Sequence, residues 1–429
     1  MRTVRVGLIG LGTVGSGVVE IFSRHREDFA RRAGVDIELV RFADRDSSSA
    51  ARLGLAESSF TTEAAEIVDD PDIDIVVELI GGTGVARDIV LGALSKGKSV
   101  VTANKALMAT HGQEVMDAAA LNGVDVMFEA SVGGGIPIIS PLKHCLVSNE
   151  ITTVMGIVNG TTNYILTRMA IDGMDYDSAL AEAQELGFAE SDPTADVDGH
   201  DSAAKIAILA SIAFNSRITL AEVSVEGIRR ISSADIAIAH ERGYAIKLLA
   251  IARRIDGAID IRVHPAMIPL GHPLASVNGV YNAIYVIGDA VGETMFFGEG
   301  AGSLPAASAV VGDIIEVARH IQSGCLGVVG CTCNEQLPLI DSAELDFSYY
   351  VRMRVADRPG VLAAVAGAFG DNGVSIGSVI QKTADESGAE IVYVTHKSSE
   401  RAVRTALEQI DALDCVVRLE TVLRLEDQQ

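Results

Sequence analysis

One short segment near the start of the chain constrains its fold more than any other. It reads Gly10-Leu11-Gly12-Thr13-Val14-Gly15, which fits the pattern GxGxxG, and it lies between an apolar run and a helical pattern. In this context Gly10 permits a tight turn, Gly12 lets the backbone approach a pyrophosphate, and Gly15 lets the helix pack closely on the strand. The segment therefore predicts a strand–turn–helix unit that binds a dinucleotide.

The first 133 residues alternate between strand and helix patterns. Apolar strand patterns cover residues 4–9, 37–43, 73–80, 99–102 and 124–128. Helical patterns cover residues 14–22, 87–95 and 113–121. Continuous apolar strands separated by helices indicate a parallel sheet covered on both faces. We predict an α/β protein whose residues 1–133 form a doubly wound, Rossmann-type domain.

Two charged residues follow the second predicted strand. Asp44 stands where an acid binds the ribose hydroxyls of NAD, and Arg45 could instead bind the 2′-phosphate of NADP. Either residue could also be an ordinary charged loop residue. The sequence therefore leaves NAD and NADP open.

The pattern changes after the first domain. Strand patterns cover residues 151–158, 258–263, 283–287 and 294–297, and helical patterns cover 162–171 and 178–186. This predicts an α+β domain for substrate binding and dimerisation over residues 134–304. Residues 306–321 are apolar at helical spacing, so we expect residues 305–325 to return to the first domain.

The last part of the chain reads as a separate small domain. Residues 326–345 have the glycines and proline of a linker. Residues 346–429 then show the order βαββαβ, with strands over 349–355, 375–381, 390–395 and 416–423 and helices over 360–369 and 401–410. That order predicts a ferredoxin-like sandwich.

Composition excludes several classes of protein. The formal net charge of −24 argues against nucleic acid or an anionic membrane surface as a partner. No apolar run reaches the ~18 residues of a membrane helix. The five cysteines form no disulfide or zinc pattern, so we expect reduced thiols in a cytoplasmic protein.

A dense acidic stretch over residues 187–201 leads into an apolar helix that carries Lys205. A calcium loop starting at Thr194 fails, because Lys205 stands where a bidentate glutamate is needed. Asp201 and Lys205 are four residues apart and share one helix face. Such a pair is usually a surface salt bridge. The apolar neighbours of Lys205 instead predict that it faces a cleft, where it could protonate the alkoxide formed by carbonyl reduction.

Other residues complete a predicted site for a small zwitterion. Glu190 or Asp196 could bind an ammonium group. We expect Lys105 to close the fourth strand, at the carboxyl edge of the parallel sheet where such folds bind ligands. Residues 156–164 end a strand and begin a helix, which offers N–H groups to a carboxylate. His200 lies about 100° round the helix from Asp201 and is left unassigned.

These stretches together resemble the homoserine dehydrogenases. The matching segments are GLGTVGSG, VELIGG, TANKALMA, EASVGGGIPII, GIVNGTTNYIL, GFAESDPTADVDGHDSAAK and GAGSLPAASAVVGDI, which cover most of residues 5–320. The resemblance implies reduction of L-aspartate 4-semialdehyde to L-homoserine with NAD or NADP, in threonine, methionine and isoleucine biosynthesis.

The resemblance also implies roles for individual residues. Lys205 looks like the proton donor, supported by Asp201, and Glu190 like the residue that binds the amino group. Further residues are implied near the substrate or cofactor: Asp196, Gly160, Thr161, Lys105, and the loop from Gly298 to Gly302. A departure from the family pattern is Ala306, where a threonine is common.

A monovalent cation, Na⁺ or K⁺, is a further implication of the resemblance. The matching positions, which would contribute mainly backbone oxygens, are Glu129, Val132, Gly134 and Ile136. The residues alone fit a glycine-rich hinge between domains equally well.

The segments DRPGVL and NGVSI in the tail resemble an ACT domain. This implies pairing into a homodimer or homotetramer and binding of an amino acid, with threonine as the expected inhibitor. A purely structural dimerisation module is the alternative. Two other functions are alternatives: aldehyde oxidation to an acyl phosphate through Cys145, for which no paired base is evident, and a catalytically inactive sensor.

Overall fold

The computed structural model describes residues 3–328, 330–381 and 388–426. The remaining positions of the predicted domains and linker, 1–2, 329, 382–387 and 427–429, lie outside the described residues. The chain divides into two compact units, each built from three segments. Unit 1 comprises residues 1–158, 204–223 and 281–337, and unit 2 comprises residues 159–203, 224–280 and 338–429. The predicted boundaries at 133/134, 304/305, 325/326 and 345/346 stay a prediction.

Unit 1 contains a six-stranded parallel sheet in the order β3-β2-β1-β4-β5-β6. Its strands are β1 (Thr3–Ile9), β2 (Asp36–Ala43), β3 (Phe60–Thr61), β4 (Ile75–Glu78), β5 (Ser99–Thr102) and β6 (Val126–Met127). Every residue of β4 and β5 is buried, as expected for strands covered on both faces. The strand order reverses between β1 and β4, which places a ligand crevice at their carboxyl ends. The prediction of a doubly wound sheet is confirmed.

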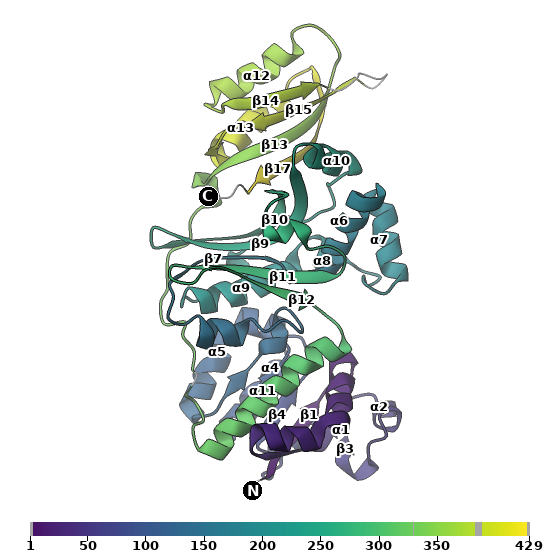
Figure 1. Cartoon of the computed structure of the whole chain (residues 1–429), viewed down its shortest axis with the longest axis vertical. Helices are drawn as coiled ribbons and strands as arrows, with labels where there is room; N and C mark the ends of the chain where they lie inside the picture. The colour runs from purple at the N-terminus through teal and green to yellow at the C-terminus, as the bar shows by residue number, and fades with distance from the viewer. Residues whose placement is uncertain (1–2, 329, 382–387, 427–429) are drawn as a thin grey trace. The chain divides into compact units, whose positions relative to one another are not determined.

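Helices cover this sheet. They are α1 (Thr13–Ala33), α2 (Ser48–Arg52), α3 (Ala64–Asp69), α4 (Val85–Ser95), α5 (Lys105–Asn122) and α11 (Ser303–Ser323). The late helix α11 lies along the first helix α1 (Figure 1). Gly17 permits this approach, because a Cβ atom there would lie 2.7 Å from the carbonyl oxygen of Ser303. Val310 and Ile314 of α11 share one core with Val18 and Phe22 of α1.

Unit 1 also holds an antiparallel ribbon and the end of a buried helix. The ribbon has the order β12-β11-β7, with β7 (Ile151–Ile157), β11 (Tyr281–Gly288) and β12 (Gly292–Glu299). The helix is α9 (His200–Ala213), in which every residue from 201 to 210 is buried. The boundary between the two units falls within α9.

Unit 2 contains the hairpin of β9 (Tyr244–Ile255) and β10 (Ala258–Pro269), which pair along twelve residues each. Its helices are α6 (Gly160–Asp172), α7 (Tyr176–Glu185), α8 (Thr194–Val197) and α10 (Ser233–Glu241). The strand β9 was not predicted. Its sequence, YAIKLLAIARRI, lacks the alternation of a half-buried strand. Seven consecutive residues, 246–252, are buried, and Lys247 alone among them is not apolar.

The C-terminal part of unit 2 has the predicted βαββαβ order. Its elements are β13 (Asp346–Val355), α12 (Val361–Asp371), β14 (Ile376–Gln381), β15 (Ala389–Thr395), α13 (Glu400–Asp411) and β17 (Val416–Leu425). The strand order β17-β13-β15-β14 is that of a ferredoxin-like sandwich, which confirms this prediction. β17 also pairs in parallel with β10, at Ala266 and Met267, so one sheet runs on from the hairpin into this domain.

Buried charges reinforce that junction inside unit 2. Glu426, directly after β17, pairs with Arg253 of β9 at 2.6 Å and with Arg262 of β10 at 2.8 Å. Asp235 of α10 accepts a hydrogen bond from Arg352 of β13 at 2.6 Å. These carboxylates and Arg262 are at most 5 % exposed.

None of the helices in the described part of the chain is long and apolar enough to cross a membrane.

Candidate active site

The glycine turn of unit 1 has the geometry that a dinucleotide needs. Gly10 has φ +99°, and a Cβ atom there would lie 2.8 Å from the carbonyl of Leu79. A Cβ atom at Gly15 would lie 2.0 Å from the carbonyl oxygen of Gly10. A Cβ atom at Gly12 would instead meet nothing within 4 Å, so its backbone faces open space. The turn leads into α1, which begins at Thr13 and Val14, so a phosphate could approach Gly12 and the helix N-terminus.

Asp44 holds this turn in place. Its Oδ2 accepts the N–H of Leu11 at 2.6 Å and its Oδ1 accepts the N–H of Asp46 at 2.9 Å. Arg45 is exposed, and both residues line a cavity of about 380 Å³ beside Ile9 and Ile80. The neighbouring charges thus differ: the Asp44 carboxylate is fixed by backbone groups, and the Arg45 side chain is exposed at the cavity.

A buried glutamate organises the ends of β4 and β5. Glu78 is fully buried; its Oε1 accepts the N–H groups of Ile80 and Gly81 at 2.8 and 2.9 Å, and its Oε2 accepts the Thr102 hydroxyl at 2.7 Å. Asn104 donates to the same Oε2 at 3.3 Å and caps α5 by accepting the N–H of Leu107. These contacts fix the loop after β4 and the start of α5.

Lys105 is the first residue of α5 and is exposed. The strand β5 ends at Thr102, so Lys105 starts the helix instead of closing the strand. Sequence reasoning did not give Glu78 or Asn104 a role. The available signal was an acid that ends an otherwise apolar strand.

The stretch predicted to bind a cation is tightly folded within unit 1. The Glu129 carboxylate accepts the N–H groups of three residues, Ile138, Ile139 and Ser140, at 2.6–2.7 Å. Val132, Gly134 and Ile136 are buried. Gly134 has φ +56°, and a Cβ atom there would lie 2.5 Å from the carbonyl oxygen of Gly300. This stretch therefore lies against the loop of residues 298–302.

That loop also reaches the glycine turn. Gly302 caps α11 with φ +131°, and the next residue, Ser303, donates its hydroxyl to the carbonyl of Thr13 at 2.7 Å. Gly300 leaves room for Asn282, since a Cβ atom at Gly300 would lie 1.9 Å from the Asn282 amide nitrogen. Asn282 is 1 % exposed, and its amide has no hydrogen-bond partner within the described residues.

In unit 2, Asn159 joins two of the predicted site residues, Asp196 and Asp201. The Asn159 amide nitrogen donates to Oδ1 of Asp196 at 2.7 Å and to Oδ2 of Asp201 at 2.8 Å. Its oxygen caps α6 by accepting the N–H of Thr162 at 2.9 Å. The local motif around Asn159 does not indicate that this residue joins the two carboxylates.

The start of α6 and the loop after α7 complete this group. Gly160 begins α6, and the Thr161 hydroxyl donates to the carbonyl of Phe188 at 2.6 Å. Glu190 lies two residues further along this loop and is exposed; its carbonyl accepts the amide of Gln184 at 3.0 Å. The contacts described here bring Asp196, Asp201 and Asn159 together, and they do not include the Glu190 carboxylate.

Lys205 is buried, with 8 % of its surface exposed, so the surface salt bridge considered from the sequence is wrong. Its ammonium group donates to the carbonyl of Val158 at 2.6 Å, within unit 1. Asp201, one turn earlier on α9, is held by Asn159 within unit 2. The consecutive residues 158 and 159 therefore position the two charged groups of α9. His200 begins α9 and is exposed.

Comparison with known proteins places this geometry in a family. A family model described as homoserine dehydrogenase matches residues 137–315, and one described as homoserine dehydrogenase, NAD binding domain, matches residues 10–129. A curated homoserine dehydrogenase of Synechocystis is 46 % identical over 432 residues, which cover 99 % of both chains. The chain belongs to the homoserine dehydrogenase family. It is an oxidoreductase with a nicotinamide-cofactor domain.

Other relatives agree along the whole length. A homoserine dehydrogenase of Corynebacterium glutamicum is 45 % identical, covering 99 % of this chain and 96 % of its own. A crystal structure of a homoserine dehydrogenase from Thiobacillus denitrificans has a TM-score of 0.94 at 43 % identity, covering 100 % of this chain and 99 % of its own. An ACT-domain model matches residues 349–415, which confirms the assignment of the tail.

Proposed function

We propose that the chain reduces L-aspartate 4-semialdehyde to L-homoserine, with Lys205 as the proton donor. When bound, a reduced nicotinamide would provide the hydride for the carbonyl carbon. The alkoxide that results takes a proton from the Lys205 ammonium group. The observation that carries this role is a buried ammonium oriented by the Val158 carbonyl, one helical turn from Asp201. Asp201 is proposed to keep Lys205 charged and in position.

The amino-acid end of the substrate is proposed to bind near Asn159. Asp196 and Glu190 are the candidate carboxylates for the substrate ammonium. Asn159 orients Asp196 through a hydrogen bond of 2.7 Å, which supports its part in this role. The N–H groups of Gly160 and Thr161 at the start of α6 are suited to the substrate carboxylate. Lys105, at the carboxyl edge of the sheet, is proposed to lie between cofactor and substrate.

The cofactor is proposed to be bound by Gly10, Gly12, Thr13, Val14, Gly15 and Gly302, with a preference for NADPH. Both oxygens of Asp44 already accept backbone N–H groups, which makes Asp44 a support for the turn. Arg45 is exposed at the same cavity, where its guanidinium could bind a 2′-phosphate. A structural relative is an archaeal homoserine dehydrogenase mutant in complex with NADPH, with a TM-score of 0.64 at 29 % identity, covering 74 % of this chain and 98 % of its own.

A monovalent cation, Na⁺ or K⁺, is proposed to bind the backbone oxygens of Glu129, Val132, Gly134 and Ile136. Support comes from the burial of this stretch and from the Asn282 amide beside Gly300, which lacks a hydrogen-bond partner in the described part of the chain. Oxygen-rich, buried surroundings suit such an ion. Its role would be to hold the stretch against the loop of residues 298–302.

The ACT domain is proposed to bind threonine as a feedback inhibitor and to pair with a second copy in a homodimer or homotetramer. Residues 355–362 turn from β13 into α12 and line a cavity of about 360 Å³ together with Gln381 and Ile391. Gly360 adopts φ +94° in this turn. Such a cavity is large enough for a small amino acid.

One assay tests the proposed reaction. Oxidation of NADPH and of NADH is followed by absorbance with aspartate semialdehyde, with and without threonine. We expect faster oxidation of NADPH and inhibition by threonine. Lack of oxidation with either cofactor would refute the reductase and favour the sensor. The alternative reaction, aldehyde oxidation to an acyl phosphate through Cys145, would instead reduce NAD⁺ or NADP⁺ and would require phosphate as a substrate.

A further inference from the structure

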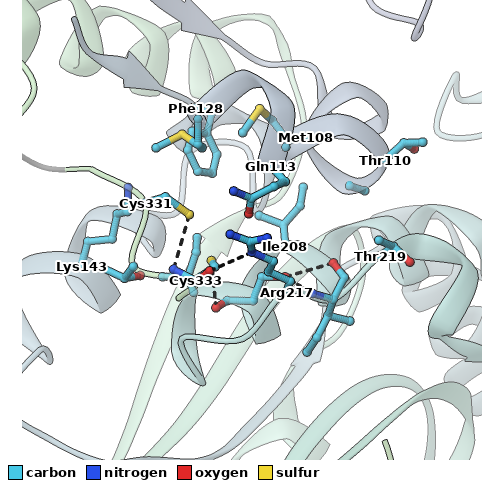
Figure 2. Close-up of a pocket in the computed structure, with 17 residues that line it drawn as sticks. Met108, Thr110, Gln113, Phe128, Lys143, Ile208, Arg217, Thr219, Cys331 and Cys333 are labelled. Carbon is cyan, nitrogen blue, oxygen red and sulfur yellow. Dashed lines mark hydrogen bonds between the residues drawn. The ribbon is translucent and has the colours of Figure 1, made fainter. Parts of the chain in front are cut away.

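A second cavity lies in unit 1, between α5, the end of α9 and residues 331–333 (Figure 2). It encloses about 100 Å³, and Met108, Phe128 and Ile208 give it a mainly apolar wall. Its lining, as far as the structure describes it, includes none of the residues proposed above for catalysis, cofactor or cation binding. The proposed function therefore assigns no role to this cavity.

Two thiols and one ammonium group enter it. The N–H of Cys333 donates to the sulfur of Cys331 at 3.4 Å, and the Cys333 thiol donates to the carbonyl of Ser211 at 3.2 Å. Lys143 extends beside Cys331 (Figure 2), with its ammonium 5.5 Å from the centroid of the Phe128 ring. All three side chains are partly buried, so small molecules can still reach them.

The two thiols differ strongly in acidity. The proximity of Cys333, first its side chain and then its backbone N–H, lowers the pKa of Cys331 to about 6 against the opposing effect of burial, and the charge of Lys143 acts in the same direction. The same pairing raises the pKa of Cys333 above its ordinary range. Further charged groups act on these residues from the neighbouring elements: Arg217, Asp117, Asp125 and Asp313. Cys331 is therefore the more acidic thiol of the pair, and the one suited to act as the nucleophile.

We propose that Cys331 and Cys333 form a peroxide-reactive thiol pair, in which Cys331 is the nucleophile and Cys333 resolves the product into an intrachain disulfide. The Cys331 thiolate attacks one oxygen of hydrogen peroxide, an S–O bond forms, the O–O bond breaks, and hydroxide leaves. Cys333 then attacks the sulfenic sulfur, an S–S bond forms, and the second hydroxide leaves. The protons of the two thiols convert both hydroxides to water, so two thiols are oxidised and one peroxide is reduced.

The surrounding backbone keeps the pair in place beside α9. The N–H of Arg217 donates to the carbonyl of Glu335 at 3.1 Å, and the N–H of Glu335 donates to the carbonyl of Asn215 at 3.0 Å. Leu337 donates to the Ser216 hydroxyl at 2.9 Å. Disulfide formation would remove the Cys333 thiol from Ser211 but leave these bonds. The reaction is independent of the proposed dehydrogenase activity.

Peptide mass spectrometry of the full-length reduced protein tests the pair after treatment with hydrogen peroxide and dimedone, which traps sulfenic acids. We expect a 331–333 disulfide in the unmodified chain and a dimedone adduct at Cys331 in Cys333→Ser. Cys331→Ser should give neither product. Cys145→Ser, which removes an exposed thiol elsewhere, should behave like the unmodified chain. Absence of the disulfide, or a sulfenic acid that persists at Cys331 with Cys333 present, would overturn the proposal.

The rate of alkylation by iodoacetamide at pH 6 is a second test that needs no variant. Cys331 should be thiolate in a larger fraction of molecules than an ordinary exposed thiol, although its thiolate is intrinsically less nucleophilic. The two effects together predict that Cys331 is alkylated about tenfold faster than such a thiol. Cys145 in the same sample provides that comparison. Lys143→Met should lower the ratio several-fold. Equal rates at Cys331 and Cys145 would show that Cys331 is not the nucleophile.

Discussion

The side-chain amide of Asn159 lies 2.8 Å from Oδ2 of Asp201, although 42 positions of sequence separate the two residues. The same nitrogen donates to Asp196 at 2.7 Å. One neutral amide therefore holds two carboxylates that would otherwise repel each other. If these carboxylates orient the proton donor and the substrate, the exact position of Asn159 matters more than its own chemistry.

Asn159→Ala is expected to lower kcat/KM by about 10- to 100-fold. The loss of a hydrogen-bond donor to a buried carboxylate such as that of Asp201 costs about 1–3 kcal/mol. Steady-state kinetics with NADPH and semialdehyde measure the change. A positioning role predicts that both kcat and KM change, while the folded protein keeps its affinity for NADPH. Asn122→Ala, at an exposed helix end, is the control and should leave kinetics unchanged. Unaltered kinetics in Asn159→Ala would refute the positioning role.

Lys205→Met removes the ammonium but keeps a side chain of similar length in the buried position. We expect kcat to fall by about 10²–10⁴-fold with NADPH binding retained, because a general acid contributes on that scale. Fluorescence titration measures NADPH binding, and stopped-flow absorbance measures hydride transfer. Turnover within tenfold of the unmodified enzyme would assign proton donation elsewhere.

Lys247→Met is the matched control for loss of a buried lysine. Lys247 is 4 % exposed, burial lowers its pKa to about 8, and its ammonium donates to the carbonyl of Val277 at 2.6 Å. It has no part in the proposed chemistry. Its substitution should change the free energy of unfolding, while kcat per folded molecule stays close to normal.

Arg45→Ala tests the proposed cofactor preference. Loss of a charge-assisted contact to the 2′-phosphate should cost about 1.5–3 kcal/mol, and therefore lower kcat/KM for NADPH by about 10- to 100-fold. The value for NADH should change less than about twofold. Arg41→Ala is the control, because this nearby arginine is already paired with Glu66 at 2.6 Å. An equal loss with both cofactors would argue against 2′-phosphate recognition.

Glu426→Gln tests the buried charges that join the ACT domain to the β9–β10 hairpin. Burial alone would raise the pKa of Glu426, but His264, Arg253 and Arg262 together hold it well below its ordinary value. The stabilising contribution is therefore present above the unfolded pKa of about 4.3 and is lost as the pH falls through the lower folded value. At pH 7 the variant should lose about 3–5 kcal/mol of stability.

Urea unfolding at several pH values measures this effect. The free energy of unfolding of the unmodified chain should fall more steeply below about pH 4.5 than that of Glu426→Gln. Glu344→Gln breaks an exposed pair with Arg401 and should cost at most about 1 kcal/mol. Parallel pH curves for the unmodified chain and Glu426→Gln would show that the Glu426 carboxylate does not provide this acid sensitivity.

Local patterns were sufficient to predict the doubly wound sheet and the small C-terminal domain. Glycines 10, 12 and 15 stand within six residues between one strand and one helix, so the local pattern is enough to predict the turn, although Gly10 also lies against Leu79. The buried face of α9 was also visible, because apolar residues surround Lys205. These features depend on one strand, one turn or one helix at a time.

Features that depend on distant residues were not predictable. Glu78 meets Thr102 and Asn104 across 24 and 26 positions, and no local pattern indicates that a strand-ending acid will accept four hydrogen bonds. Asn159 joins Asp196 and Asp201 only once a helix and a loop fold back beside it. The strand β9 was missed because a nearly continuous apolar run fits a buried helix as well as a buried strand.

Because β10 pairs in parallel with β17, the C-terminal domain cannot be removed at its boundary in the sequence without exposing the hairpin. A chain ending before β13 would expose the edge of β10 at Ala266 and Met267 and would leave Arg253 and Arg262 without the Glu426 carboxylate. An exposed strand edge invites association with other chains. A version of this protein without the C-terminal domain would therefore need a changed hairpin edge, with polar or charged residues at Ala266 and Met267 and no unpaired Arg253 and Arg262.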